Sequence, residues 1–526
     1  MSMAFTSLGF LGLVAAAVLL FYILPGGCRP YVLLAASMAF YVIGGGKTVV
    51  CVLFTAATVY FAALGLDAYN RKRKTLPKED RRAFDARALR SRRAIVLAVC
   101  LLNFGLLYVL KYWNFTAELI APLVDRVAKG KSVPTVRLLM PLGVSFFMFQ
   151  SVGYVVDVYR GKCPAQKNFL KLLLFVSFFP QMVQGPISRY DRLGPQLCHE
   201  KPLDCTDLRR GIELMMWGYF KKLVIADRAA VAVNAIMERV WQQTGSVMAF
   251  GVLLYCIQLY CDFSGGIDIT RGVAQLFGIR LEENFRRPIF ARSLTEFWRR
   301  WHITLGAWMR DYVFYPLALS GPFAALGKLT RKKIGGKLGK IVPTSLATFI
   351  IYFIIGVWHG ANFRYIAYGF WNGAIITSSL LLAARYEALK TKLRIDENRG
   401  WFRAFQTLRT CLIVFIGRYI TRAPRLLTAF WMMKETVLHP GFASLTDGTL
   451  LTFGLGLYDY LVIATGTLVL LGAEWYQEKR GDVGEAVEKK SPFVQWLVLF
   501  VSLLALLVLG IMRSDGISSE FIYKQF

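Results

Sequence analysis

Long apolar runs separated by short basic stretches are the feature that most constrains the fold of this 526-residue chain. Residues 3–24, 49–66, 94–110 and 493–512 each approach the roughly 20 residues that an α-helix needs to cross a bilayer. Hydrophobic residues make up 56% of the chain and charged residues only 18%, which is too little polar surface for a soluble protein of this size. We therefore predict an all-α, polytopic membrane protein.

The basic residues indicate which loops face the cytoplasm. The net charge is +30, and residues 71–93 alone hold eleven Lys or Arg against three acidic residues. Residues 328–340 and 385–403 are two further basic connectors. Cytoplasmic loops carry such an excess, so we expect residues 71–93 to be cytoplasmic, with three spans before them and the N-terminus outside. The charge fits a lipid bilayer as partner, and no nucleic acid is expected.

The middle of the chain is less regular. We expect about 11–13 membrane helices, including re-entrant segments such as the one that ends at Gln184-Gly185-Pro186. Broken helices at membrane depth are tolerated where they face protein or a water-filled cavity. We interpret 1–526 as a single integral-membrane domain, with N-terminal spans (1–135), a core that holds His302 and His359 (136–385) and C-terminal spans (386–526). None of the nine cysteines forms a CxxC pair, and no metal site is expected.

His359 ends an apolar segment and is a candidate base. If 328–340 and 385–403 are both cytoplasmic, residues 341–384 form a hairpin, and His359 lies about 27 Å along its first helix, near the turn. A neutral imidazole at that depth can accept a proton from a hydroxyl. A histidine that only makes hydrogen bonds within the bundle fits the spacing equally well.

His302 lies in a Trp/Arg-rich segment, 295–311, which reads as one amphipathic helix. Trp298, Trp301, Leu305 and Trp308 form its apolar stripe, and His302 lies at the edge of that stripe. A Trp/Arg belt that anchors the helix at the interface and a functional histidine are both compatible with this pattern.

Two carboxylates, Asp262 and Asp268, lie at the end of another apolar segment together with Ser264. A spacing of six residues points them about 120° apart on a helix, so they share no face. We therefore expect partners of arginines or backbone amides here and no two-carboxylate acid/base pair.

The ordered motifs together resemble the membrane-bound O-acyltransferase (MBOAT) family, and within it the bacterial branch of alginate O-acetylation and teichoic-acid D-alanyl transfer proteins. The resemblance covers roughly residues 1–480. It is carried by these stretches: Pro141–Phe146, Tyr154–Arg160, Phe179–Pro180 with Gln184–Pro186, Tyr260–Gly265, Glu283–Phe285, Thr295–His302, Trp308–Tyr312 and Trp358–Phe363.

The resemblance implies a ring-like helical bundle with an outer funnel, and it implies roles for single residues. The family's catalytic histidine corresponds to His359 and its second motif histidine to His302. The residues that would line the passage for substrate and donor are Trp298, Arg299, Trp301, Asp311, Trp358 and Asn362, with Asp262, Ser264 and Asp268 as structural motif residues. One departure is that residues 315–322 replace the Gly-Gly-Asn-Arg turn of alginate-type members.

From this resemblance we expect an O-acyltransferase that moves an acyl group, with acetyl favoured, from a cytoplasmic thioester to a hydroxyl outside. The donor would be acetyl-CoA or an acyl carrier protein, with no bound cofactor. The acceptor would be a separate extracytoplasmic acyltransferase or acceptor protein, or a cell-surface polysaccharide or cell-wall polymer. The alternatives are a membrane transporter, which would also contain broken helices, and an O-acyltransferase acting on an intracellular lipid or protein.

Overall fold

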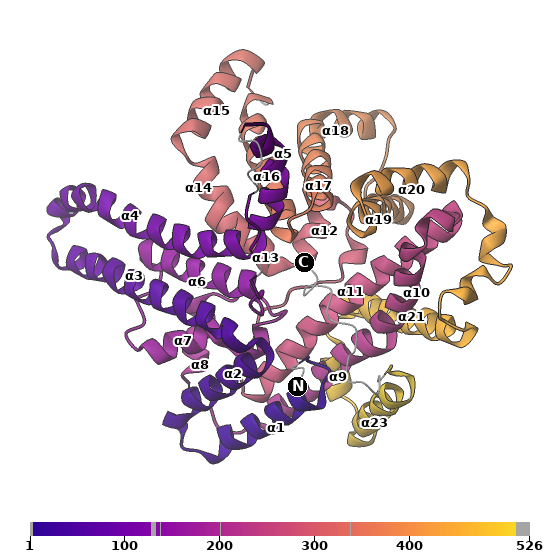
Figure 1. Cartoon of the computed structure of the whole chain (residues 1–526), viewed down its shortest axis with the longest axis horizontal. Coiled ribbons are helices and arrows are strands. Elements are labelled where there is room, and N and C mark those ends of the chain that lie inside the picture. The colour runs from indigo at the N-terminus through magenta and orange to yellow at the C-terminus, as the bar shows by residue number, and fades with distance from the viewer. Residues whose placement is uncertain (1–3, 128–132, 137, 200, 337, 512–526) are drawn as a thin grey trace. The chain divides into compact units, whose positions relative to one another are not determined.

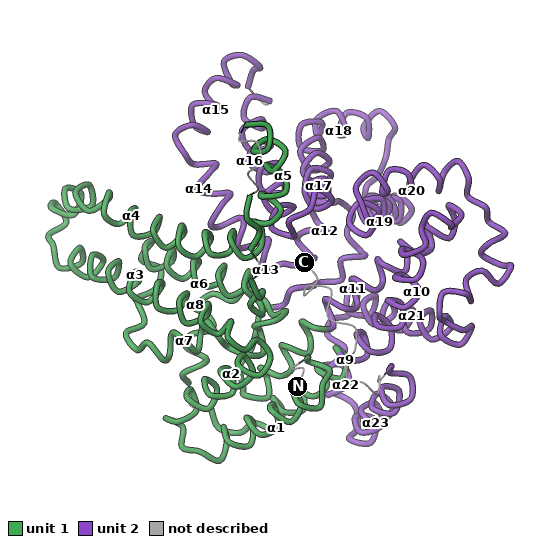
Figure 2. Tube along the Cα trace, in the orientation of Figure 1, with its two compact units in different colours: residues 1–218, 266–282, 512–525 green, residues 219–265, 283–511, 526 purple. Residues whose placement is uncertain are grey.

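The computed structural model describes residues 4–127, 133–136, 138–199, 201–336 and 338–511, and it is helical as predicted. Helices make up 81% of it, and the described residues contain an isolated β-bridge, Phe285 with Trp301, but no strand. Two compact units share the described residues (Figure 2). Unit 1 comprises 1–218 and 266–282, and unit 2 comprises 219–265 and 283–511.

Unit 1 is built around α3, which packs against α4, α6 and α7, while α2 packs against α1 and α7 (Figure 1). Its helices are α1 (Leu8–Ile23), α2 (Arg29–Gly45), α3 (Val49–Thr75), α4 (Lys78–Lys111), α5 (Trp113–Val127), α6 (Val144–Tyr159), α7 (Phe169–Ser177), α8 (Tyr190–Leu197), α9 (Cys205–Tyr219) without its last residue, and the end of α11 (Gly245–Leu276).

Unit 2 holds both candidate histidines, and its largest helix–helix contact joins α16 to α17. Its elements are the π-helical η4 (Phe220–Ala226), α10 (Asp227–Glu238), the first part of α11, α12 (Leu294–Arg300), α13 (Ile303–Met309), the π-helical η7 (Arg310–Phe314), α14 (Tyr315–Ala318), α15 (Gly321–Ile334), α16 (Leu338–His359), α17 (Phe363–Leu381), α18 (Ala383–Lys392), α19 (Gly400–Arg422), α20 (Leu426–Leu438), α21 (Leu457–Arg480), α22 (Val483–Glu488) and α23 (Pro492–Leu509).

Six of the helical segments in the described chain are long and apolar enough to cross a membrane, and the bent pair of α17 and α18 is a seventh candidate. Other predicted segments form shorter apolar helices, among them α1 and α6. The chain is therefore a multi-pass membrane protein. The predicted division at residues 135 and 385 stays a prediction.

Two local expectations were wrong in detail. The basic stretch 71–93 is helical on both sides of a short turn, because α3 extends to Thr75 and α4 begins at Lys78. Lys, Arg, Glu and Ala are good helix formers, so the spans continue past the apolar run. The segment that carries Asp262 does not end there either, since α11 passes through Gly265-Gly266 and continues to Leu276.

The hairpin predicted for 341–384 is present as α16 and α17, which lie side by side in Figure 1. Glycines bring the two backbones together one turn before His359. A Cβ on Gly356 would lie 2.5 Å from the carbonyl oxygen of Tyr365 and 2.8 Å from the Cα of Gly369. Small residues allow such close helix packing within a membrane. The hairpin therefore fixes the position of His359 at its turn.

Candidate active site

The two candidate histidines come together in unit 2, with a tryptophan between them. His359 is the last residue of α16, and its ring lies 4.9 Å from the Trp358 ring, centroid to centroid. The Trp358 ring lies 5.9 Å from that of His302. His302 is 3% exposed and His359 is half-buried. The tertiary structure thus joins two motifs that are 57 positions apart in the sequence.

His302 lies at a break between two short helices, and the prediction of one continuous helix over 295–311 was wrong. α12 ends at Arg300 and α13 begins at Ile303, with His302 at φ +49°. This left-handed conformation costs a non-glycine residue about 1–2 kcal/mol. The residue pattern is helical on both sides of the break, so hydrophobic periodicity alone could not reveal it. Backbone held in such a sparsely populated region is typical of functional sites.

Asn284 determines which nitrogen of His302 carries the proton. Its Oδ1 accepts hydrogen bonds from the backbone N–H of Thr304 at 2.9 Å and from the Thr304 hydroxyl at 2.9 Å, and it lies 3.3 Å from His302 Nδ1. A backbone N–H can only donate, so the atom that faces it is the amide oxygen. His302 Nδ1 must therefore donate to this oxygen, which leaves the lone pair on Nε2.

Burial keeps the His302 ring neutral. Desolvation lowers the pKa of His302 well below its ordinary value of 6.5, and a positive charge on His359 would lower it further. The Phe263 ring, whose centroid lies 4.9 Å from that of the His302 ring, adds to this apolar environment. At neutral pH His302 is thus an uncharged imidazole whose Nε2 can accept a hydrogen bond or a proton.

The predicted tryptophans Trp298 and Trp301 pack against residues of α12, α17 and α19. Trp301 stacks on Phe297 at 5.5 Å, and the guanidinium of Arg418 lies 5.3 Å from its ring centre. Trp298 donates from its indole nitrogen to Asn372 Oδ1 on α17 at 3.1 Å. Arg418 and Asn372 are both buried. These contacts tie α12 to α17 and α19 around the end of the hairpin.

Three predicted passage residues make other contacts. Arg299 is exposed. Asp311 pairs with the neighbouring Arg310 at 3.1 Å. Asn362 caps α17, since its side chain accepts from the backbone N–H of Arg364 at 3.0 Å. The structure thus gives Asn362 a helix-capping role three residues from His359.

The motif carboxylates have separate partners, as the spacing predicted. Asp262 lies 2.5 Å from Nζ of Lys222, and Asp227 lies 2.8 Å from the same nitrogen. The neighbouring Lys221 donates to Ser264 at 3.0 Å. In unit 1, Asp268 pairs with Arg271 at 3.6 Å.

Sequence reasoning missed Lys222 and Asn284 as members of this site. The signal for Lys222 was present, because a lysine inside an apolar segment requires a partner. Among the described residues, no group of three or more His, Cys, Asp or Glu side chains is placed to hold a metal ion.

Comparison with known proteins agrees with these observations. The family model of the membrane-bound O-acyltransferase family matches residues 164–330, a range that includes His302 and ends before His359. A probable alginate O-acetylase from Pseudomonas syringae is 30% identical over 485 residues, which cover 90% of this chain and 82% of the relative.

Two further relatives modify cell-wall polymers. The peptidoglycan O-acetyltransferase of Helicobacter pylori is 28% identical over 56% of this chain and 57% of its own length. The teichoic acid D-alanyltransferase of Bacillus subtilis is 28% identical over 55% of this chain and 70% of its own length. All three relatives are named for transfer reactions, and none for transport. The chain belongs to the membrane-bound O-acyltransferase family and is an O-acyltransferase.

Proposed function

We propose that this enzyme moves an acetyl group from a cytoplasmic thioester, acetyl-CoA or an acyl carrier protein, to a hydroxyl on the outer side of a bacterial inner membrane. The observation that carries the proposal is the pairing of His302 and His359 through Trp358 at the turn of the α16–α17 hairpin. Acetyl is favoured because a relative whose alignment covers 90% of this chain is named as a probable O-acetylase.

In the proposed reaction His359 is the general base. Its imidazole takes the proton from the acceptor hydroxyl as the oxygen attacks the thioester carbonyl carbon. The C–S bond then breaks, and the proton passes from the imidazolium to the departing thiolate. His302 supports the same step as a neutral group, because its Nδ1–H is held by Asn284 and its Nε2 keeps a lone pair. Trp298 and Trp301 shape the route by which the donor reaches the histidines.

The proposed acceptor is a separate extracytoplasmic protein that passes the acyl group on to a polysaccharide or cell-wall polymer. His359 lies at the hairpin turn, and an outer position of that turn is supported by the basic connectors at both ends of the hairpin, which are typical of cytoplasmic loops. The relatives named above act on alginate, peptidoglycan and teichoic acid, all of which are polymers. A narrow route between helices would admit a single side-chain hydroxyl more readily than a polymer.

The test is acyl transfer by the purified enzyme in liposomes. Radiolabelled acetyl-CoA is supplied on one side, and transfer to water or to an added hydroxyl acceptor is measured. His359→Ala should lower the rate about 10²- to 10⁴-fold, the range expected for loss of a general base, and should leave the melting temperature unchanged. The exposed His439, which pairs with Glu435, provides the matched control, because His439→Ala should keep full activity. If His359→Ala kept more than about a tenth of the rate, this assignment would be wrong.

A further inference from the structure

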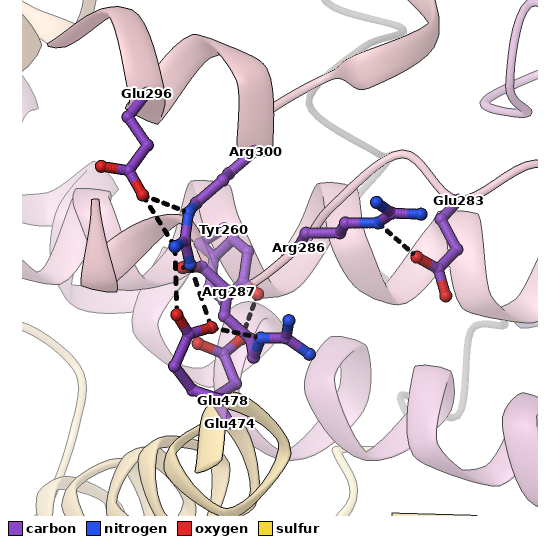
Figure 3. A network of polar contacts seen from close by, with 8 residues as sticks. All are labelled: Tyr260, Glu283, Arg286, Arg287, Glu296, Arg300, Glu474 and Glu478. Atoms are coloured by element: carbon purple, nitrogen blue, oxygen red, sulfur yellow. Dashed lines mark hydrogen bonds and ion pairs between the residues drawn. The ribbon is translucent and has the colours of Figure 1, made fainter. Parts of the chain in front are cut away.

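The last turn of α21 holds the segment that carries His302. Glu478 forms a bidentate ion pair with Arg300, at 3.0 Å for each oxygen, and its Oε2 also accepts from Nε of Arg287 at 2.7 Å. Figure 3 shows this one carboxylate between the two arginines. Arg287 and Arg300 are the two ends of the segment 287–300, which leads directly to His302, so Glu478 holds these two ends together.

The same segment is paired along its backbone. Phe285 forms an antiparallel bridge with Trp301, and the N–H of Arg286 donates to the carbonyl of Arg300 at 2.9 Å. The N–H of Ile303 donates to the carbonyl of Asn284 at 3.0 Å. This pairing places the Asn284 side chain opposite His302, and any shift in its register would separate the two.

Left-handed backbone occurs at both ends of this pairing. Arg287 has φ +50° and His302 has φ +49°. Non-glycine residues keep such angles only where the surroundings hold them in place. Glu478 forms ion pairs with Arg287 itself and with Arg300, which lies two residues before His302. These ion pairs therefore act at the positions whose left-handed backbone must be held in place.

A second residue of α21 supports the backbone pairing next to His302. Glu474, one turn before Glu478 and 5% exposed, accepts a hydrogen bond from the hydroxyl of Tyr260. The Tyr260 ring in turn contacts Phe285 at 5.8 Å and Trp301 at 5.9 Å. Two turns of α21 thus support this backbone pairing, one directly through Glu478 and the other indirectly through Tyr260.

These ion pairs differ from the exposed pairs on the same segment. The Glu478 and Arg300 side chains are 25% and 20% exposed, whereas those of Glu283 and Arg286 are 44% and 63% exposed. A bidentate arginine–carboxylate pair fixes orientation as well as distance, whereas an exposed single pair contributes little. Arg300 also pairs with Glu296 at 2.7 Å, but that carboxylate lies on the same short helix α12. The Glu478 pairs instead join Arg287 and Arg300 to a separate helix, α21.

We propose that Glu478 is a positioning residue for acyl transfer, which holds Arg287 and Arg300 so that His302 keeps its strained backbone and its hydrogen bond to Asn284. This inference rests on the proposed function and extends the site to α21, which lies outside the family-model match. Glu478 acts through His302 and does not itself touch the reacting groups.

The test compares three variants. Glu478→Gln keeps the shape and loses the charge, and it should lower kcat about 10- to 100-fold, as expected when a catalytic group is misplaced by about 1 Å. KM for acetyl-CoA and the melting temperature should change little. Glu478→Asp should restore part of kcat. Glu387→Gln breaks an exposed pair with Lys390 and should behave as wild type.

Two readouts separate positioning from general destabilisation. Diethyl pyrocarbonate labelling, mapped by mass spectrometry, should modify His302 about tenfold faster in Glu478→Gln than in wild type, because local opening exposes the ring. In the double variant with His302→Ala, Glu478→Gln should cause no further loss of rate, because residues that act as one unit are not additive.

Unchanged His302 labelling together with unchanged kcat in Glu478→Gln would overturn the inference, as would a fully additive double variant. Absence of acyl transfer by the wild-type enzyme would refute the proposed function instead, and the labelling experiment would still judge the role of Glu478 in holding His302.

Discussion

Replacing Asn284 by aspartate tests how the site keeps His302 neutral. Asn284→Asp retains an oxygen that can accept from the backbone N–H and the hydroxyl of Thr304, so the local geometry is preserved. It also places a negative charge 3.3 Å from His302 Nδ1. The substitution therefore changes the electrostatics of the imidazole and little else.

The size of the effect follows from that distance. An opposite charge within 4–6 Å shifts a pKa by about one to three units, and the Asn284 position lies inside this range. In wild type, burial keeps the pKa of His302 well below 6.5. The carboxylate should raise this pKa by about one to three units, so that His302 takes up a proton at a higher pH than in wild type. Its Nε2 then donates a hydrogen bond and can no longer accept a proton.

The assay is the pH dependence of acetyl transfer between about pH 5.5 and 8.5, where histidine titrates. The acid limb of the rate profile should move to higher pH by about one to three units in Asn284→Asp. Asn234→Asp, at an exposed position on α10, should keep the wild-type profile. An unshifted acid limb in Asn284→Asp would refute the tautomer and charge assigned to His302.

The pH dependence of thermal stability also reports the pKa of His302. In wild type the pKa of folded His302 lies below its ordinary value of 6.5, so the unfolded chain takes up the proton first as the pH falls. The contribution of His302 to stability is therefore complete above pH 6.5 and is lost below it. In Asn284→Asp the carboxylate raises the folded pKa of His302 from its wild-type position, so less of this contribution is lost as the pH falls. The melting temperature of the variant should therefore fall less steeply below pH 6.5 than that of wild type.

The remaining predictions concern the buried lysine and the topology. Lys222→Met should destabilise the protein by about 3–5 kcal/mol, because it removes the positive charge between two buried carboxylates. Thermal aggregation in detergent measures this loss of stability. Adding Asp262→Asn and Asp227→Asn to Lys222→Met should recover much of it. If Lys222→Met melted like wild type, the ion pairs would not stabilise the fold. A cysteine introduced at Arg82 in a cysteine-free background should react with an impermeant maleimide only after the cells are opened, and one at Thr6 should react in intact spheroplasts. Reversed labelling would contradict the proposed orientation.

The parts of the site that could be predicted are those that depend on local sequence. The hairpin could be predicted because the apolar stretch 341–384 lies between two basic connectors, 328–340 and 385–403, that both read as cytoplasmic. The basic connectors then gave the position of His359 at the turn. Asp262 and Asp268 were correctly separated because helical spacing decides which side chains share a face.

The parts that could not be predicted depend on contacts between distant segments. His302 lies within a residue pattern that is helical throughout, and the break occurs because Asn284 and the paired backbone compete successfully with the helix. Glu478 lies 176 positions beyond His302. In the sequence it follows an apolar run, where a charged residue commonly marks only the end of a membrane helix. Only the fold shows that its carboxylate lies between Arg287 and Arg300.

This arrangement explains why the functional unit is larger than the region matched by the family model. The match at 164–330 contains His302, Asn284 and both arginines but neither His359 nor Glu478. The strained backbone at His302 is favourable only while the ion pairs from α21 and the hydrogen bonds of Asn284 offset its cost, and the second histidine is supplied by a separate hairpin. A fragment limited to the matched region would therefore keep the motif residues around His302 but would lack His359 and the ion pairs from α21.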